Sequence, residues 1–146
     1  MLDALLSTRP DAAMLIARLI LAGVIFPHGL QKVFGWFGGP GIRGSLGYFH
    51  SLGIPTPLGV LAVAAEFLGP IALALGLFGR VAALAIGGVM ITAAVLVHQP
   101  NGFFMNWYGN HKGEGFEYHL LALGLVLVLV VRGSGAASLD LALAGR

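Results

Sequence analysis

Four long apolar segments divide the chain. They run from Ala12 to Phe34, Leu58 to Phe78, Val81 to Val97 and Phe116 to Val131. A transmembrane helix needs about 20 apolar residues, with a lower limit of about 17, so the last two segments are short but acceptable. The pattern predicts an all-α membrane protein: one domain, residues 1–146, folded as a bundle of four transmembrane helices.

The connections between these segments differ in length. The second and third segments are predicted to join in a tight hairpin at Gly79 and Arg80. The other two connections are long and fall on the same face of the membrane, because two spans separate them. Ile42 to Leu52 in the first is predicted to form a short interfacial helix. Aromatic residues in both indicate either an aromatic belt at headgroup level or the mouth of a ligand site.

Composition supports a membrane protein and excludes several other classes. Hydrophobic residues make up 58% of the chain, charged residues make up 10%, and the mean hydropathy is +0.91. Soluble globular chains carry about 25% charged residues. The net charge of +2 gives no reason to expect a nucleic-acid partner. With no cysteine, the chain has no disulfide, thiolate nucleophile or cysteine-ligated metal of its own.

Basic residues outside the spans predict the orientation. Positive-inside counting favours both termini in the cytoplasm, by a small margin, and the two long loops outside. We expect no cleavable signal peptide, because the first residues carry two acids and no small-residue cleavage site follows the apolar stretch. One face is flanked by Arg9, Arg80, Arg132 and Arg146, and the other by Lys32, Arg43 and Lys112.

Glu66 is the most informative residue, because no other charge interrupts the apolar run around it. At 1.5 Å per residue it lies about 12 Å below the outer membrane face, and His28 lies about 10 Å below it. Ionisable groups at such depth face the bundle interior or a cavity and find partners there. His28 and Lys32 are the predicted partners. Burial favours the neutral form of Glu66 and a nearby cation favours the charged form, and the sequence leaves both open.

Every segment delivers an ionisable group to the outer half of the predicted bundle. They are His28 and Lys32 in the first segment, Glu66 in the second, His98 in the third, and Glu117 and His119 in the fourth. Arg18 stands apart, nearer the cytoplasmic end. Its side chain is expected to snorkel toward lipid phosphates, and the alternative is a turn into the bundle toward Glu66. Pro27 and Pro70 free backbone carbonyls near His28 and Glu66.

A set of short motifs resembles the DoxX family. They are HGLQKVFGWFGG at 28–39, LGIP at 52–55, Glu66-x-x-Gly69, GLFGR at 76–80, HxxNGFF at 98–104, Glu117 and SLD at 138–140. The resemblance implies a small four-helix protein of the bacterial or archaeal inner membrane, described as an oxidoreductase or a quinol oxidase subunit. The family pattern carries over to Arg18, His28, Gln31, Lys32, Glu66, Arg80, His98, Asn101 and Glu117.

The first functional hypothesis is a component of a redox system that binds a quinone, a quinol or a similar membrane-soluble aromatic. Glu66 and His28 are then the candidate catalytic residues, handling protons. The candidate ligand-binding residues are Arg18, Gln31, Lys32, His98, Asn101 and Glu117. A quinone is the first cofactor candidate. A haem held by His28 and His98 ranks below it, and no metal site is predicted.

Two alternatives assign the chain no chemistry. It could be a docking or assembly subunit for a soluble oxidoreductase, with the buried charges fixing the helix arrangement. It could also be a small-solute transporter, although charge confined to one half of the bundle argues against a full path. The expected partners are the lipid bilayer, oxidoreductase subunits and a second copy of the chain. Whether the chain is an enzyme stays open.

Overall fold

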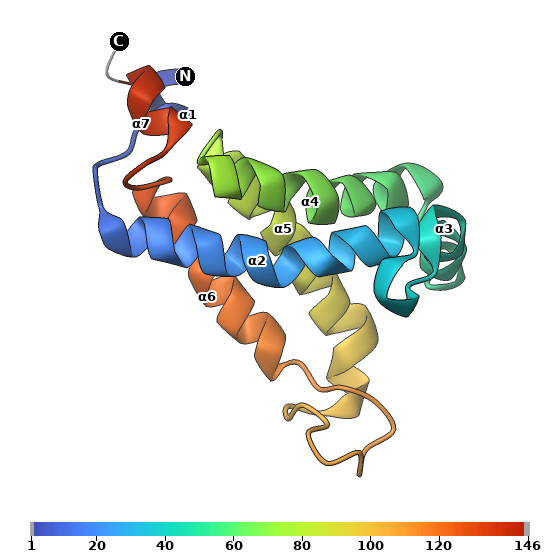
Figure 1. The fold of residues 1–146 in the computed structure, drawn as a ribbon. Coiled ribbons are helices and arrows are strands. Elements are labelled where there is room, and N and C mark those ends of the chain that lie inside the picture. The colour runs from blue at the N-terminus through green and yellow to red at the C-terminus, as the bar shows by residue number, and fades with distance from the viewer. Residues whose placement is uncertain (1, 145–146) are drawn as a thin grey trace.

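The computed structural model describes residues 2–144, and the long elements in this range are helices (Figure 1). The chain passes through α1 (Leu2–Leu6), α2 (Ala12–Phe34), η1 (Trp36–Gly38), α3 (Gly41–Ser51), α4 (Thr56–Leu75), α5 (Gly79–Ala93), α6 (Glu117–Arg132) and α7 (Leu139–Ala144). The π-helical turn η2 (Ala94–His98) and the 3-10 turn η3 (Gln99–Asn101) extend α5. The prediction of an all-helical membrane protein is confirmed for this range.

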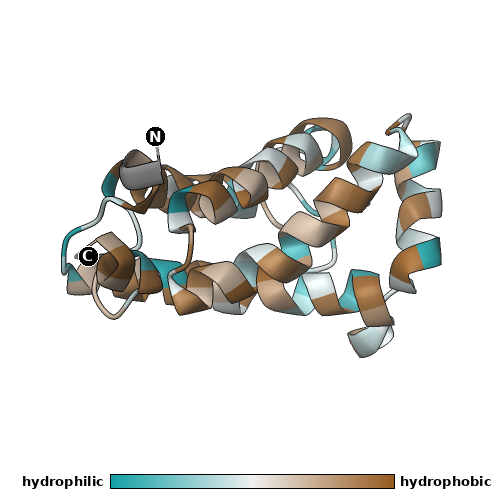
Figure 2. Ribbon diagram, turned by 90° about the horizontal axis from the view of Figure 1, so that it is seen from above, coloured by the Kyte–Doolittle hydropathy of each residue, from teal (hydrophilic) through white to brown (hydrophobic). Residues whose placement is uncertain are grey.

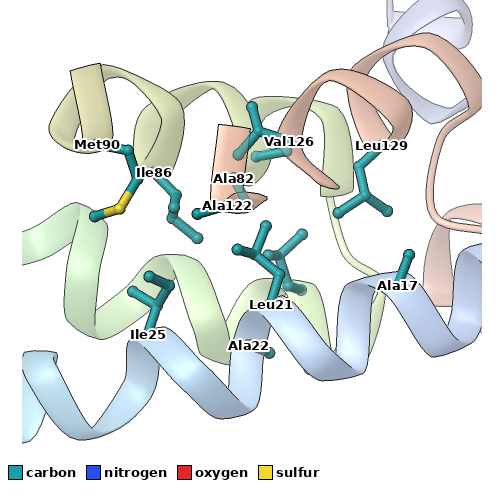
Figure 3. Packing of buried hydrophobic residues seen from close by; sticks show 12 residues of the cluster. Ala17, Leu21, Ala22, Ile25, Ala82, Ile86, Met90, Ala122, Val126 and Leu129 are labelled. Atoms are coloured by element: carbon teal, nitrogen blue, oxygen red, sulfur yellow. The ribbon is translucent and has the colours of Figure 1, made fainter. Parts of the chain in front are cut away.

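Four helices pack around one core. α2 contacts α4 and α6, and α5 contacts the same two helices from the other side. Figure 3 shows Leu21 and Ile25 of α2 pointing toward Ile86 of α5 and Val126 of α6. These side chains are buried, and small residues such as Ala83 between them let the helices approach closely.

The helix boundaries agree with the apolar pattern to within a few residues. α2 and α6 fall where the first and fourth segments predict them, and α3 coincides with the expected short helix. Three helical stretches are long and apolar enough to cross a membrane: Ala12–Phe34, Thr56–Leu75 and Gly79–Asn101. At 16 residues, α6 is shorter than these, so the fourth crossing stays a prediction. Arg146, counted in the orientation, lies outside the described residues.

The outward surfaces of these helices are apolar. Figure 2 shows hydrophobic residues along the helices and hydrophilic residues mainly toward their ends. Large apolar side chains stand exposed there, for example Ile20 at 52% and Leu61 at 64%. A soluble protein rarely exposes so much contiguous apolar surface, whereas a bilayer covers it without cost.

The predicted hairpin at Gly79 and Arg80 is wrong by a few residues. α4 ends at Leu75, the turn is formed by residues 76–78, and Gly79 already begins α5. Gly76 ends α4 with φ 64°, a left-handed conformation that glycine adopts without strain, and Phe78 adopts φ 49°. The apolar run hid this break, because Leu77 and Phe78 are as hydrophobic as the helices they separate.

Asp140 explains why the turn falls there. Its carboxylate accepts hydrogen bonds from the backbone N–H of Phe78 at 2.7 Å, from the N–H of Gly79 at 2.9 Å and from the Ser134 hydroxyl at 2.5 Å. A carboxylate at a helix N-terminus satisfies free N–H groups and opposes the positive end of the helix dipole. Asp140 belongs to the first turn of α7 and is 1% exposed, so these bonds hold the start of α7 against the start of α5.

Arg18 is bound at the same end of the bundle. It is 1% exposed, and its guanidinium donates to the carbonyls of Leu73, Ala74, Ala136 and Ala137 at 2.6–3.1 Å. The snorkelling prediction for Arg18 is therefore wrong, and the side chain does not turn toward Glu66 either. The last carbonyls of α4 form the negative end of the helix dipole, and Arg18 bonds two of them, although the Leu73 carbonyl also accepts from the Gly76 N–H.

We predict that Asp140→Ala lowers the free energy of unfolding by about 2 to 4 kcal/mol, because buried N–H groups then lose a charged acceptor. Unfolding of the purified protein in mixed micelles measures this. The control is Arg132→Gln, which breaks the exposed Arg132–Asp11 pair and should cost less than about 1 kcal/mol. Equal losses for the two variants would contradict the capping role.

Candidate functional site

A buried ion pair joins α2 to α4 in the apolar part of the bundle. Lys32 Nζ lies 2.5 Å from Glu66 Oε2, and the two side chains are 22% and 6% exposed. Of the two partners expected for Glu66, the structure therefore selects Lys32. The contact is ionic rather than a hydrogen bond of regular geometry, since Oε2 has no such partner among the described residues.

Backbone features of α2 and α4 bring Lys32 and Glu66 close together. Pro70 lies in α4 four residues after Glu66 and has no N–H, so it cannot bond the Glu66 carbonyl. Gly29 of α2 lies against that carbonyl: an added Cβ would overlap the oxygen and come within 2.7 Å of the Glu66 carbonyl carbon. The two helices thus touch at Gly29, and Lys32, nearly one turn further along α2, reaches the Glu66 side chain.

A second polar group surrounds the start of α6. The His98 and His119 ring centroids are 4.2 Å apart, those of Tyr118 and His119 are 5.3 Å apart, and those of His28 and Tyr118 are 6.5 Å apart. His28 is exposed, whereas His119 is only 5% exposed. The Tyr118 hydroxyl and His119 Nδ1 are buried and have no hydrogen-bond partner among the described residues. Such groups are free to bond a ligand or water.

Sequence reasoning gave Tyr118 no role and His119 only a place near the outer face. A signal for His119 was present, because it shares the spacing of Ala122 and Val126, which face the core. Tyr118 sits beside this face, and only the approach of α2 places His28 next to it. Neither placement follows from α6 alone.

Three other candidate residues bond atoms of the two long loops. Glu117 Oε1 accepts from the Met105 N–H at 2.9 Å and from Trp107 Nε1 at 3.1 Å. Asn101 Nδ2 donates to the Glu114 carbonyl at 3.1 Å, and Gln31 Nε2 donates to the Phe37 carbonyl at 3.4 Å. These bonds go to loop atoms rather than to the Lys32–Glu66 pair, so the structure assigns all three a part in loop geometry.

His98 belongs to both regions. Its Nδ1 lies 2.9 Å from the Glu114 carbonyl of the loop between α5 and α6, and its side chain also lines a groove that contains Lys32 and Glu66. It stands at the end of the π-helical turn η2, which alters the register of α5 just before the loop. His98 therefore contacts the loop between α5 and α6 and lines the same groove as the buried pair.

This groove runs between α4 and α5, with α3 at one end. Its volume is about 1210 Å³. The walls are almost wholly apolar: the ionisable lining residues are Lys32, Tyr48, Glu66 and His98. We call it the α4–α5 groove. A long apolar cavity with a few convergent polar groups is the usual form of a ligand site.

The lower-ranked alternative, a haem held by His28 and His98, gains no support from the ring contacts. The His98 ring contacts His119, and the His28 ring contacts Tyr118. Within residues 2–144, no three His, Asp or Glu side chains are grouped so as to hold a metal ion.

Comparison with known proteins agrees with this architecture. The DoxX family model matches residues 13–99. The chain belongs to the DoxX family. Over 130 residues this DoxX chain is 27% identical to "Inner membrane protein YqjF" of Escherichia coli K12, covering 89% of the chain and 91% of the relative.

Two further relatives are similar over most of their length. "Putative oxidoreductase CatD" of Bacillus subtilis 168 is 29% identical, with 89% of the chain and 86% of the relative covered. "Inner membrane protein YphA" of Escherichia coli K12 is 29% identical, with 87% of each covered. No solved structure matches the chain. With its apolar helices, this DoxX chain is a multi-pass inner-membrane protein.

We predict that Gly29→Ala lowers the free energy of unfolding by about 2 kcal/mol, because the new methyl group overlaps the Glu66 backbone and separates α2 from α4. Gly23→Ala is the matched control on the same helix. An added Cβ there meets nothing within 4 Å, so this change should be neutral or stabilising by up to about 1 kcal/mol. Thermal unfolding in one detergent compares the two, and equal effects would contradict the close contact at Gly29.

The ion pair leads to a double-mutant prediction. Lys32→Met leaves a buried carboxylate unpaired and should cost about 3 kcal/mol, the lower end for a buried pair, since Lys32 keeps 22% exposure. Adding Glu66→Leu removes the orphaned charge and should restore stability to within about 1 kcal/mol of the parent. Additive losses in the double variant would show that the two charges do not stabilise each other.

Proposed function

We propose that this DoxX protein binds a quinone, a quinol or a similar membrane-soluble aromatic in the α4–α5 groove, as a component of a membrane redox system. One observation carries the proposal: a groove of about 1210 Å³ with apolar walls contains the buried Lys32–Glu66 pair. The relative named "Putative oxidoreductase CatD" supports the redox assignment.

The pair matches the head of such a ligand. An ammonium donates to a quinone carbonyl, and a carboxylate accepts from a quinol hydroxyl. Both interactions gain strength where water is scarce. Glu66 is our candidate for proton handling at the head, and His98 on the same wall is a second ligand-binding candidate. His28, beside Tyr118, is the candidate that passes protons toward the outer face.

The proposal includes a topology with four spans and both termini in the cytoplasm. α1 packs against α7, so both ends of the chain lie together, away from α3 (Figure 1). α6 packs along α2 and α5, as a fourth membrane helix would. In this orientation the Lys32–Glu66 pair lies in the outer half of the bilayer, and the electrons come from or go to a partner subunit.

Binding of a decyl-chain benzoquinone to protein in lipid nanodiscs tests this function. Glu66→Gln removes the acceptor charge and should weaken binding about tenfold, or about 1.4 kcal/mol. Gly88→Leu leaves the pair intact but fills the groove: Gly88 lines the wall, and an added Cβ meets nothing within 4 Å. We expect it to weaken binding at least tenfold.

Gly124→Leu is the matched control, since Gly124 is equally open but lies on α6 outside the groove. It should change binding less than twofold. If the parent protein binds no quinone, or if all three variants bind alike, the groove is not a quinone site. Co-purification of a soluble oxidoreductase without bound quinone would then favour the docking role.

A further inference from the structure

We infer that the α4–α5 groove holds a ligand with a single long apolar chain, such as a polyprenyl quinol, and that the chain runs from the Lys32–Glu66 pair toward the α4–α5 turn. This inference rests on the proposed function and goes beyond it, since binding of the ring alone would satisfy that proposal. The class of ligand is defined by its long apolar tail.

The groove is longer than a single aromatic ring. From Glu66 to the end of α4 at Leu75, the helix rises about 13 Å at 1.5 Å per residue, and the lining continues to Phe78 and Val81. A single aromatic ring fills only the part next to Glu66. The volume of about 1210 Å³ also exceeds the roughly 300–1,000 Å³ of common small-molecule sites.

The part of the groove inward of Glu66 has an apolar lining. Inward of Glu66 it consists of small and apolar residues, with Gly69 and Ala72 from α4 and Ala82 and Ala85 from α5. No ionisable side chain lines the groove between Glu66 and the turn. A polar tail would find no partner there, whereas a flexible apolar chain fills the space between the two helices.

The position of the polar pair distinguishes this ligand from other occupants. A phospholipid keeps its headgroup at the membrane surface, which leaves Lys32 and Glu66 facing its acyl chains. A helix from a second copy is 10–12 Å across, wider than a single apolar chain. Residues of α3 and of the connection to α4, between Tyr48 and Pro55, line the end of the groove beyond the pair and narrow the room for a straight helix.

The lipid around the groove determines how much the apolar chain adds to the binding affinity. Lipid tails are as apolar as the groove wall, so the chain gains packing contacts rather than a hydrophobic term. We therefore expect the decyl-chain benzoquinone to bind threefold to tenfold tighter than the same ring without a chain. Affinities are expressed relative to the concentration of quinone within the nanodisc bilayer. The different partitioning of the two quinones from water into lipid then does not affect the comparison.

Ala85→Leu blocks the chain path without touching the pair. Ala85 is exposed and lines the groove, while Ala74 is exposed on α4 outside it and gives the matched control Ala74→Leu. Ala85→Leu should remove the advantage of the chain and leave binding of the chain-free ring within twofold of the parent. Ala74→Leu should change neither.

Several results would overturn the inference. Equal binding of both quinones by the parent protein, or an unchanged chain advantage in Ala85→Leu, removes the tail site and leaves the proposed function standing. A phospholipid retained by the parent and released by Ala85→Leu assigns the groove to lipid. Loss of a dimer in Ala85→Leu assigns it to a second copy. If the parent binds neither quinone, the proposed function itself fails.

Discussion

The ion pair between Lys32 and Glu66 is the constraint on which the α2–α4 side of this DoxX protein depends. A lone carboxylate in an apolar segment is expensive, and its ammonium partner offsets that cost only at close range. The close range requires α2 and α4 to touch, and Gly29 against the Glu66 carbonyl permits it. The same pair then lies in the wall of an apolar groove, where its remaining hydrogen-bonding capacity can serve a ligand.

The opposite end of the bundle has a different task. Arg18 satisfies carbonyls of α4, and Asp140 satisfies N–H groups at the start of α5. Both residues are almost fully buried, and together they tie the C-terminal segment to the α4–α5 turn. The groove between these helices therefore has one end held by a dense hydrogen-bond network. The charged groups at this end bond backbone atoms, whereas Lys32 and Glu66 pair with each other beside the groove.

Hydropathy and residue spacing along the chain predict the helices and the depth of the buried polar residues. The helices follow the apolar runs because backbone groups in lipid must be satisfied within the segment. Depth counting placed His28 and Glu66 at similar levels, with Lys32 one helical turn above His28. It could not choose between His28 and Lys32, because the choice depends on how α2 is rotated against α4. It was wrong for Arg18, where the free carbonyls of α4 were not visible in the residue pattern.

The sequence by itself determined the class of protein, the long helices, the presence of a buried carboxylate and the family. Each of these depends on local hydropathy, on spacing along one helix or on short motifs. Tertiary structure alone decided the partner of Glu66, the proximity of Tyr118 and His119 to the histidines of other helices, and the groove between α4 and α5. The physical reason is that these features arise between helices, where glycine contacts, a missing proline N–H and a buried cap set the distances.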